Sequence, residues 1–306
     1  MKFSNLKKLF CGHNKGGLIA VIIAIFVCII SQQSKADDFA GMAITKKGNG
    51  PAVIFIPGLN SAEDTFTETC TALATRHSCY LLHLPGFAGQ KPMDLQQGFL
   101  VPVKNNIIAL IKKEKLSHVT LVGHSLGGLL SLMIALDSPE LIDKIVIIDS
   151  LPFFPAIQNP LLTAELAKPQ AEQMRSQMNV QDNESFFKNA AQSVKGMTNN
   201  PKNIPLLIQW GQTSDRATTT QAMYELMTTD LRASIAAVKQ PTLVLGSWAA
   251  YKPYGSTKES TKTIFSTQYA QLKNVDIRMS ETGFHFLTWD DNEWVNQQIK
   301  QFLTIK

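Results

Sequence analysis

The sequence is poor in cysteine and in net charge, and both shortages exclude classes of protein. Only four of the 306 residues are cysteine. No cluster of histidine, cysteine and carboxylate residues has the spacing of a metal site, so we expect neither a metal nor another cofactor. The formal charge is +5, but the first 36 residues hold five lysines and no acidic residue, which leaves 24 basic and 24 acidic residues. No nucleic-acid-binding surface is therefore indicated.

The basic and apolar character of the first 36 residues predicts a secretory signal peptide. Residues 1–15 are basic, residues 18–30 are apolar throughout, and Ser34 and Ala36 place small residues before a cleavage point at Asp37. Thirteen apolar residues are short for a membrane span. We expect the protein to be periplasmic or secreted. An uncleaved anchor through residues 18–30 is the alternative, and would be the protein's sole contact with a membrane.

Cleavage before Asp37 would leave two cysteines, Cys70 and Cys79. An even number of cysteines in an exported protein is compatible with a disulfide. Two separate buried thiols fit equally well, because the sequence does not fix the distance between the two Cα atoms.

Short apolar runs alternate with helical patterns along most of the chain, which predicts an α/β fold with a mostly parallel, doubly wound sheet. The runs expected to be strands are 52–56, 79–84, 119–123, 145–148, 242–246 and 275–279. The alternation stops between residues 151 and 230, where helix-length polar stretches are broken by prolines. We therefore expect a core formed by residues 37–150 and 231–306, with residues 151–230 inserted as a helical cap.

A serine surrounded by glycines lies between one predicted strand and the helix at 126–136, in the sequence G123-H-S-L-G-G128. A sharp strand-to-helix turn would lift Ser125 away from the sheet, and glycines allow the strand and helix to pass closely. The first turn of the helix would also present free N–H groups to an anion near the serine.

Together with Pro57-Gly58-Leu59, Pro85-Gly86-Phe87 and the late Gly283-Phe284-His285, this turn resembles the α/β-hydrolase fold proteins that carry a helical cap. The resemblance implies a serine hydrolase with Ser125 as nucleophile and His285 as its base. It also implies an oxyanion hole formed by the backbone N–H groups of Leu59 and Leu126. His124 is expected to be structural.

The catalytic acid departs from the family pattern. The family commonly has an aspartate soon after the strand at 242–246, but no carboxylate occurs here before Glu259. Asp149, at the end of the strand at 145–148, is the strongest substitute, while Glu259, Asp230 or no acid at all remain open. Asp290 and Asp291 are expected to cap the last helix.

The predicted cap contains scattered Met, Phe and Trp residues, which could line an apolar pocket or only pack the cap onto the core. No Arg or Lys is placed to bind a substrate carboxylate. We expect a small to medium, apolar small-molecule ester as substrate, or less favourably an amide or thioester. Carbon–carbon bond hydrolysis, cofactor-free haloperoxidation and a non-catalytic binding role are the alternatives.

Overall fold

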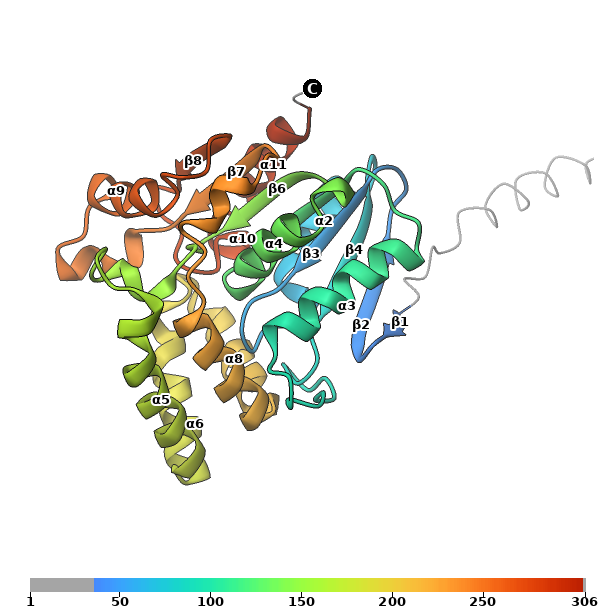
Figure 1. The fold of residues 1–306 in the computed structure, drawn as a ribbon. Coiled ribbons are helices and arrows are strands. Elements are labelled where there is room, and N and C mark those ends of the chain that lie inside the picture. The colour runs from blue at the N-terminus through green and yellow to red at the C-terminus, as the bar shows by residue number, and fades with distance from the viewer. Residues whose placement is uncertain (1–35, 305–306) are drawn as a thin grey trace, which may run out of the picture. The chain divides into compact units, whose positions relative to one another are not determined.

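A computed structural model describes residues 36–304, which form an eight-stranded sheet flanked by helices (Figure 1). The strand order is β1-β2-β4-β3-β5-β6-β7-β8, and all pairs from β4 to β8 are parallel, whereas β1 and β2 are antiparallel. The strands are β1 (Ala36–Phe39), β2 (Met42–Lys47), β3 (Ala52–Ile56), β4 (Ser78–His83), β5 (Val119–His124), β6 (Ile142–Ile148), β7 (Thr242–Gly246) and β8 (Val275–Met279).

Helices cover both faces of the sheet, because the central strands are apolar on both sides. In β3, Ile54 and Ile56 face a core shared with α3 and α4, whereas Val53 and Phe55 face a core shared with α2 and α11. The core helices are α2 (Thr67–Leu73), α3 (Leu100–Lys113), α4 (Leu126–Asp137), α9 (Lys258–Gln268), α10 (Leu287–Asp290) and α11 (Asn292–Thr304). The predicted doubly wound α/β class is confirmed.

All six predicted strands are present, but the antiparallel pair β1 and β2 was not predicted. Its turn uses Ala40 and Gly41, both of which have positive φ angles. Strand β2 alternates buried and partly exposed residues. That alternation is the signal in the sequence from which the pair could have been predicted.

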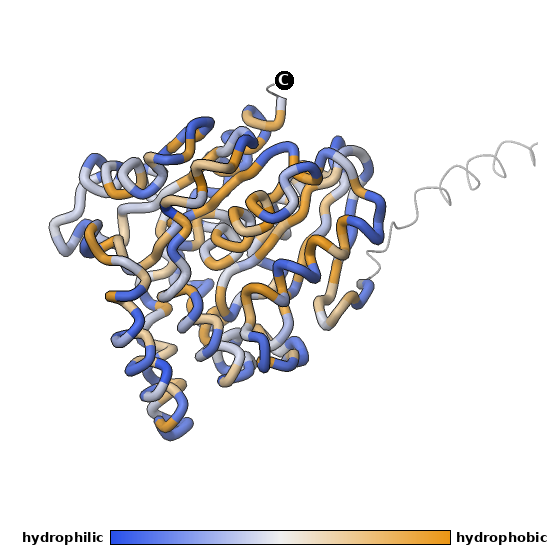
Figure 2. The backbone as a smooth tube through the Cα atoms, viewed as in Figure 1, coloured by the Kyte–Doolittle hydropathy of each residue, from blue (hydrophilic) through white to orange (hydrophobic). Residues whose placement is uncertain are grey.

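A helical cap follows β6. It consists of the α-helices α5 (Ala164–Val180), α6 (Asn183–Ser193), α7 (Ile204–Thr213) and α8 (Arg216–Thr228) and the short 3-10 helices η3 (Phe154–Ile157), η4 (Val194–Gly196) and η5 (Pro201–Asn203). Helices α5 and α6 extend away from the sheet (Figure 1). Figure 2 shows that the hydrophobic residues are concentrated in the strands and that the cap helices α5 and α6 are largely hydrophilic.

The cap is bonded directly to the core through one carboxylate. Oε1 of Glu225, on α8, accepts a hydrogen bond of 2.7 Å from the backbone N–H of Phe99, and Oε2 accepts one of 2.7 Å from that of Leu100. These N–H groups lie at the start of α3, where a helix has no partners of its own for them. The side chain of Glu225, in the cap, therefore caps the N-terminus of the core helix α3.

Cys70 and Cys79 are buried free thiols, so the disulfide that the sequence allowed between them is not formed. The thiol of Cys79, in β4, instead lies 3.5 Å from the carbonyl oxygen of Cys70, in α2. Burial and the neighbouring Cys70 sulfur raise the pKa of Cys79 strongly, with the Cys70 contact as the first cause.

The predicted signal peptide or anchor, residues 1–36, lies outside the described residues except for Ala36, which begins β1. Between residues 36 and 304, no helix has both the length and the apolar character needed to cross a bilayer.

Candidate active site

Ser125 lies between the end of β5 and the start of α4, with φ 53° and ψ −120°. A non-glycine residue with a positive φ is strained and needs surrounding structure to hold it. Its backbone N–H donates to the carbonyl oxygen of Ile148 at 3.0 Å, which fixes the turn to the end of β6.

The glycines of this turn are required by close backbone contact. A Cβ atom on Gly123 would overlap the carbonyl group of Gly127, and one on Gly127 would overlap the carbonyl group of Ile56. Strand β5 and helix α4 can therefore approach closely enough to hold Ser125 in its strained conformation, as the spacing of glycines predicts.

Asp149 follows β6 and is held from β7. Its backbone N–H donates to the carbonyl oxygen of Leu245 at 2.7 Å. Its Oδ1 accepts from the backbone N–H of Ser247 at 2.8 Å, and its Oδ2 accepts from the Ser247 hydroxyl at 2.9 Å. The Asp149 side chain is 12% exposed. The carboxylate therefore has a fixed orientation at the carboxyl edge of the parallel strands.

His285, in the segment between β8 and α10, meets this carboxylate. Its Nδ1 lies 2.7 Å from Oδ2 of Asp149. Because a carboxylate only accepts hydrogen bonds, Nδ1 carries the proton, and in the neutral ring Nε2 is the basic nitrogen. The His285 side chain is 28% exposed, so the ring is accessible from the surface.

His124 packs against His285 and binds its backbone. Its ring is buried, and the ring centroid lies 4.6 Å from that of His285 with the planes inclined by 50°. Its Nε2 donates to the His285 carbonyl oxygen at 2.9 Å. Burial is the main cause that lowers the pKa of His124 well below 6.5, and the nearby His285 lowers it further. His124 is therefore a neutral donor to the backbone, in keeping with the structural role expected for it.

The loop after β3 lies against Ser125. A Cβ atom on Gly58 would be 3.1 Å from Cβ of Ser125, so the next residue, Leu59, follows immediately beside the serine. In the part of the chain from 36 to 304, no protein group accepts a hydrogen bond from the backbone N–H of Leu59 or Leu126. These two donors are therefore not used within the described part of the protein.

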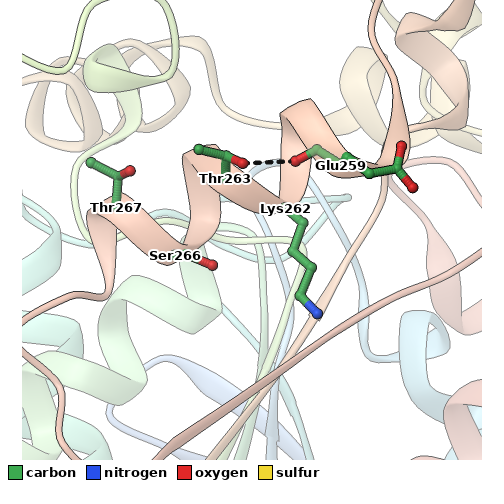
Figure 3. A pocket seen from close by; sticks show the side chains of 5 residues that line it. All are labelled: Glu259, Lys262, Thr263, Ser266 and Thr267. Atoms are coloured by element: carbon green, nitrogen blue, oxygen red, sulfur yellow. Dashed lines mark hydrogen bonds between the residues drawn. The ribbon is translucent and has the colours of Figure 1, made fainter.

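The other candidate acids lie elsewhere. Asp230 forms an ion pair of 2.6 Å with Arg232 at the end of the cap. Glu259 is on α9 beside Lys262, in a surface hollow lined only by residues of that helix; there Thr263 donates to the Glu259 carbonyl oxygen at 2.9 Å (Figure 3). Of the three carboxylates considered, Asp149 is the one hydrogen-bonded to His285.

Sequence reasoning did not identify Ser247 as part of this site. Ser247 directly follows β7, where the family commonly places its acid, and here it instead donates twice to Asp149. Its position at a strand end was the available signal. The described residues contain no group of three His, Cys, Asp or Glu side chains that could hold a metal ion.

The family model for the alpha/beta hydrolase fold matches residues 51–245. The chain belongs to this family. This confirms the resemblance that the serine turn and the late histidine indicated.

Among curated proteins, the chain is 30% identical over 115 residues to the pimeloyl-[acyl-carrier protein] methyl ester esterase of Aeromonas hydrophila, covering 38% of this chain and 44% of that protein. The chain thus spans less than half the length of the curated relatives that it matches first.

Two solved structures share the fold. One is an esterase from Exiguobacterium antarcticum, with a TM-score of 0.69, 16% identity, and coverage of 86% of this chain and 96% of that one. The other is a bromoperoxidase from Bacillus anthracis, with a TM-score of 0.71, 17% identity, and coverage of 86% and 95%. At these identities the similarity shows the fold alone, and their activities differ.

Proposed function

We propose that this α/β-hydrolase-fold protein is a serine hydrolase that cleaves carboxylic esters through an acyl-enzyme. The observation that carries the proposal is the 2.7 Å hydrogen bond between His285 and Asp149, at the same edge of the sheet as the strained Ser125. A serine hydroxyl is unreactive until a positioned base removes its proton, and an oriented imidazole is such a base.

In the proposed reaction, Nε2 of His285 takes the Ser125 proton as Oγ attacks the ester carbonyl carbon. The backbone N–H groups of Leu59 and Leu126 stabilise the resulting oxyanion. The oxyanion collapses, the bond to the alcohol oxygen breaks, and the His285 imidazolium protonates that oxygen. A water molecule, deprotonated by the same ring, then attacks the acyl carbon. The bond between that carbon and Oγ breaks, and the imidazolium returns the proton to Oγ, which releases the acid and restores Ser125.

The contacts of the two cap arginines support an uncharged acyl group. Arg175 pairs with Glu172 and stacks on Tyr224, and Arg216 donates to the carbonyl oxygens of Met178 and Gln181. Both cap arginines are therefore used within the protein and are not placed as clamps for a substrate carboxylate.

The test is labelling of purified protein, starting at Asp37, with a fluorophosphonate probe, followed by rates on p-nitrophenyl esters of increasing acyl length. We expect stoichiometric labelling that is lost in Ser125→Ala and retained in the control Ser266→Ala, which changes an exposed serine on α9. Absence of labelling in folded protein would contradict the proposal and favour a binding role. Labelling without ester turnover would favour another bond type.

Export to the periplasm or medium is proposed on the leader pattern alone. N-terminal sequencing of the protein from the native host should begin at Asp37. An intact Met1 in the membrane fraction would instead support the anchor through residues 18–30.

A further inference from the structure

The backbone on both sides of His285 is tied to other parts of the molecule. The N–H of Phe284 donates to Oδ2 of Asp290 at 3.0 Å, and the N–H of Phe286 donates to the carbonyl oxygen of Met197 at 2.9 Å. Met197 belongs to the cap, directly after η4. The residue before the histidine is thus fixed by Asp290, and the residue after it by the cap.

The same Asp290 carboxylate is also bound by the cap. Its Oδ1 accepts from the hydroxyl of Thr198 at 2.5 Å, and its Oδ2 accepts from the backbone N–H of Asn199 at 2.9 Å. The Asn199 side chain donates in turn to the carbonyl oxygen of Thr282 at 3.0 Å. One carboxylate therefore joins cap residues 198–199 to the segment that carries His285, rather than capping α11 as the sequence led us to expect.

We call this contact between cap residues 197–199 and the segment that carries His285 the junction. Apolar contacts also hold it together. Phe286 stacks on Trp289 with ring centroids 4.7 Å apart and planes inclined by 17°, and Trp210 of α7 lies 5.4 Å from the Trp289 ring. Met197 packs against the same cluster. The histidine segment is therefore enclosed between cap and core, with Asp290 as its charged partner.

We propose that Asp290 is a positioning residue for His285 and that it makes the placement of this histidine depend on cap residues 197–199. This inference rests on the proposed function. All three donors to Asp290 need an acceptor, and both oxygens are used. Asparagine has the same shape but replaces one acceptor by an N–H₂ group, which would face donors and displace the segment. A misplacement of about 1 Å in a catalytic group can lower a rate by about 100-fold.

The first experiment compares Asp290→Asn with Glu293→Gln, an exposed carboxylate at the start of α11. We expect the rate of fluorophosphonate labelling and kcat for a p-nitrophenyl ester to fall about 10- to 100-fold in Asp290→Asn, with KM changed less than about threefold, and to be unchanged in Glu293→Gln. Unchanged kcat in folded Asp290→Asn protein would overturn the proposal, since a merely structural residue would lower the amount of folded protein and not its kcat.

A second pair of variants tests the cap side of the junction and guards against failure of Asp290→Asn to fold. Thr198 is 3% exposed, and Thr198→Val removes its hydroxyl with little change of shape, whereas Thr198→Ser keeps it. We expect kcat to fall about tenfold in Thr198→Val and to remain near wild type in Thr198→Ser. Equal rates in the two variants would contradict the dependence on the cap.

A spectroscopic readout separates this proposal from the proposed function. The proton between His285 and Asp149 should give a downfield proton NMR signal in the full protein, identified by its loss in Asp149→Asn. We expect Asp290→Asn and Thr198→Val to shift or broaden it, whether or not any ester is cleaved. A signal unchanged in both variants would overturn the positioning role.

Discussion

Nδ1 of His285 lies 2.7 Å from Oδ2 of Asp149, although 136 residues separate the two in the chain. The aspartate comes from the end of β6 and is held by Ser247 after β7, so two neighbouring strands fix the orientation of the imidazole. A hydrogen bond of this kind sets which ring nitrogen is basic.

Replacing this aspartate should nearly abolish turnover. In Asp149→Asn, the amide cannot stabilise an imidazolium and can favour the wrong tautomer, so we expect kcat to fall by about 10⁴-fold. Steady-state kinetics on a p-nitrophenyl ester would measure this. The matched control is Glu259→Gln, which should keep the wild-type kcat. A larger loss in the control than in Asp149→Asn would assign the acid to Glu259.

Ser247 should contribute through its hydroxyl. Ser247→Ala removes the 2.9 Å hydrogen bond to Oδ2 of Asp149 but keeps the backbone donor to Oδ1. Hydrogen bonds to charged groups contribute about 1.5–3 kcal/mol. We therefore expect kcat to fall about tenfold or more in Ser247→Ala. Ser247→Thr retains the hydroxyl and should recover most of the rate. If alanine and threonine behave alike, the hydroxyl has no role.

The strained turn should tolerate no side chain at its first glycine. Gly123→Ala would place a Cβ against the Gly127 carbonyl group, and we expect the free energy of unfolding to fall by about 3 kcal/mol or more. Gly211→Ala on α7 is the contrasting variant, because no atom lies within 4 Å of its added Cβ. There we expect a gain of about 0.5–1 kcal/mol. Urea unfolding of both variants would measure the difference.

The ion pair between His83 and Glu63 should make the free energy of unfolding depend on pH. Nδ1 of His83 lies 2.7 Å from Oε2 of Glu63. Burial acts to lower the pKa of His83, but the Glu63 carboxylate, the Phe87 carbonyl oxygen and Asp64 together outweigh it, and the net pKa is raised above 6.5. His83 in turn is the main cause that lowers the pKa of Glu63 below 4.5. Between pH 4.5 and pH 6.5, therefore, Glu63 is ionised and His83 is protonated in the folded protein.

The sign of the effect follows from these directions. Because folding raises the pKa of His83, protonated His83 stabilises the folded state. This contribution to the free energy of unfolding is complete below pH 6.5 and is lost as the pH rises through the folded-state pKa. We expect the free energy of unfolding of the wild type to exceed that of His83→Gln most near pH 5.5–6, and the difference to shrink above neutrality. Urea unfolding across this range is the measurement.

The predictable parts of this molecule are those set by local pattern. Strand β3 is a continuous apolar run next to turn residues, and β5 and β7 are mostly apolar. The glycines around Ser125 match the spacing of a sharp strand-to-helix turn. Helix α9, Lys258–Gln268, was not predicted because its buried face includes the polar residues Thr261 and Gln268 beside Phe265, so no apolar stripe marks it. Ser247 and Asp290 were missed as site residues because their contacts join segments far apart in the chain, which no local pattern records.

The contact of Glu225 with the start of α3 bears on how the chain folds. Removing the cap would strip two backbone N–H groups of their acceptor at a helix that packs on the centre of the sheet. Cap and core should therefore melt in one cooperative transition, with no partly folded state in which the cap alone has detached. A lid that opens as a separate unit would have to break this link between Glu225 and the start of α3 first.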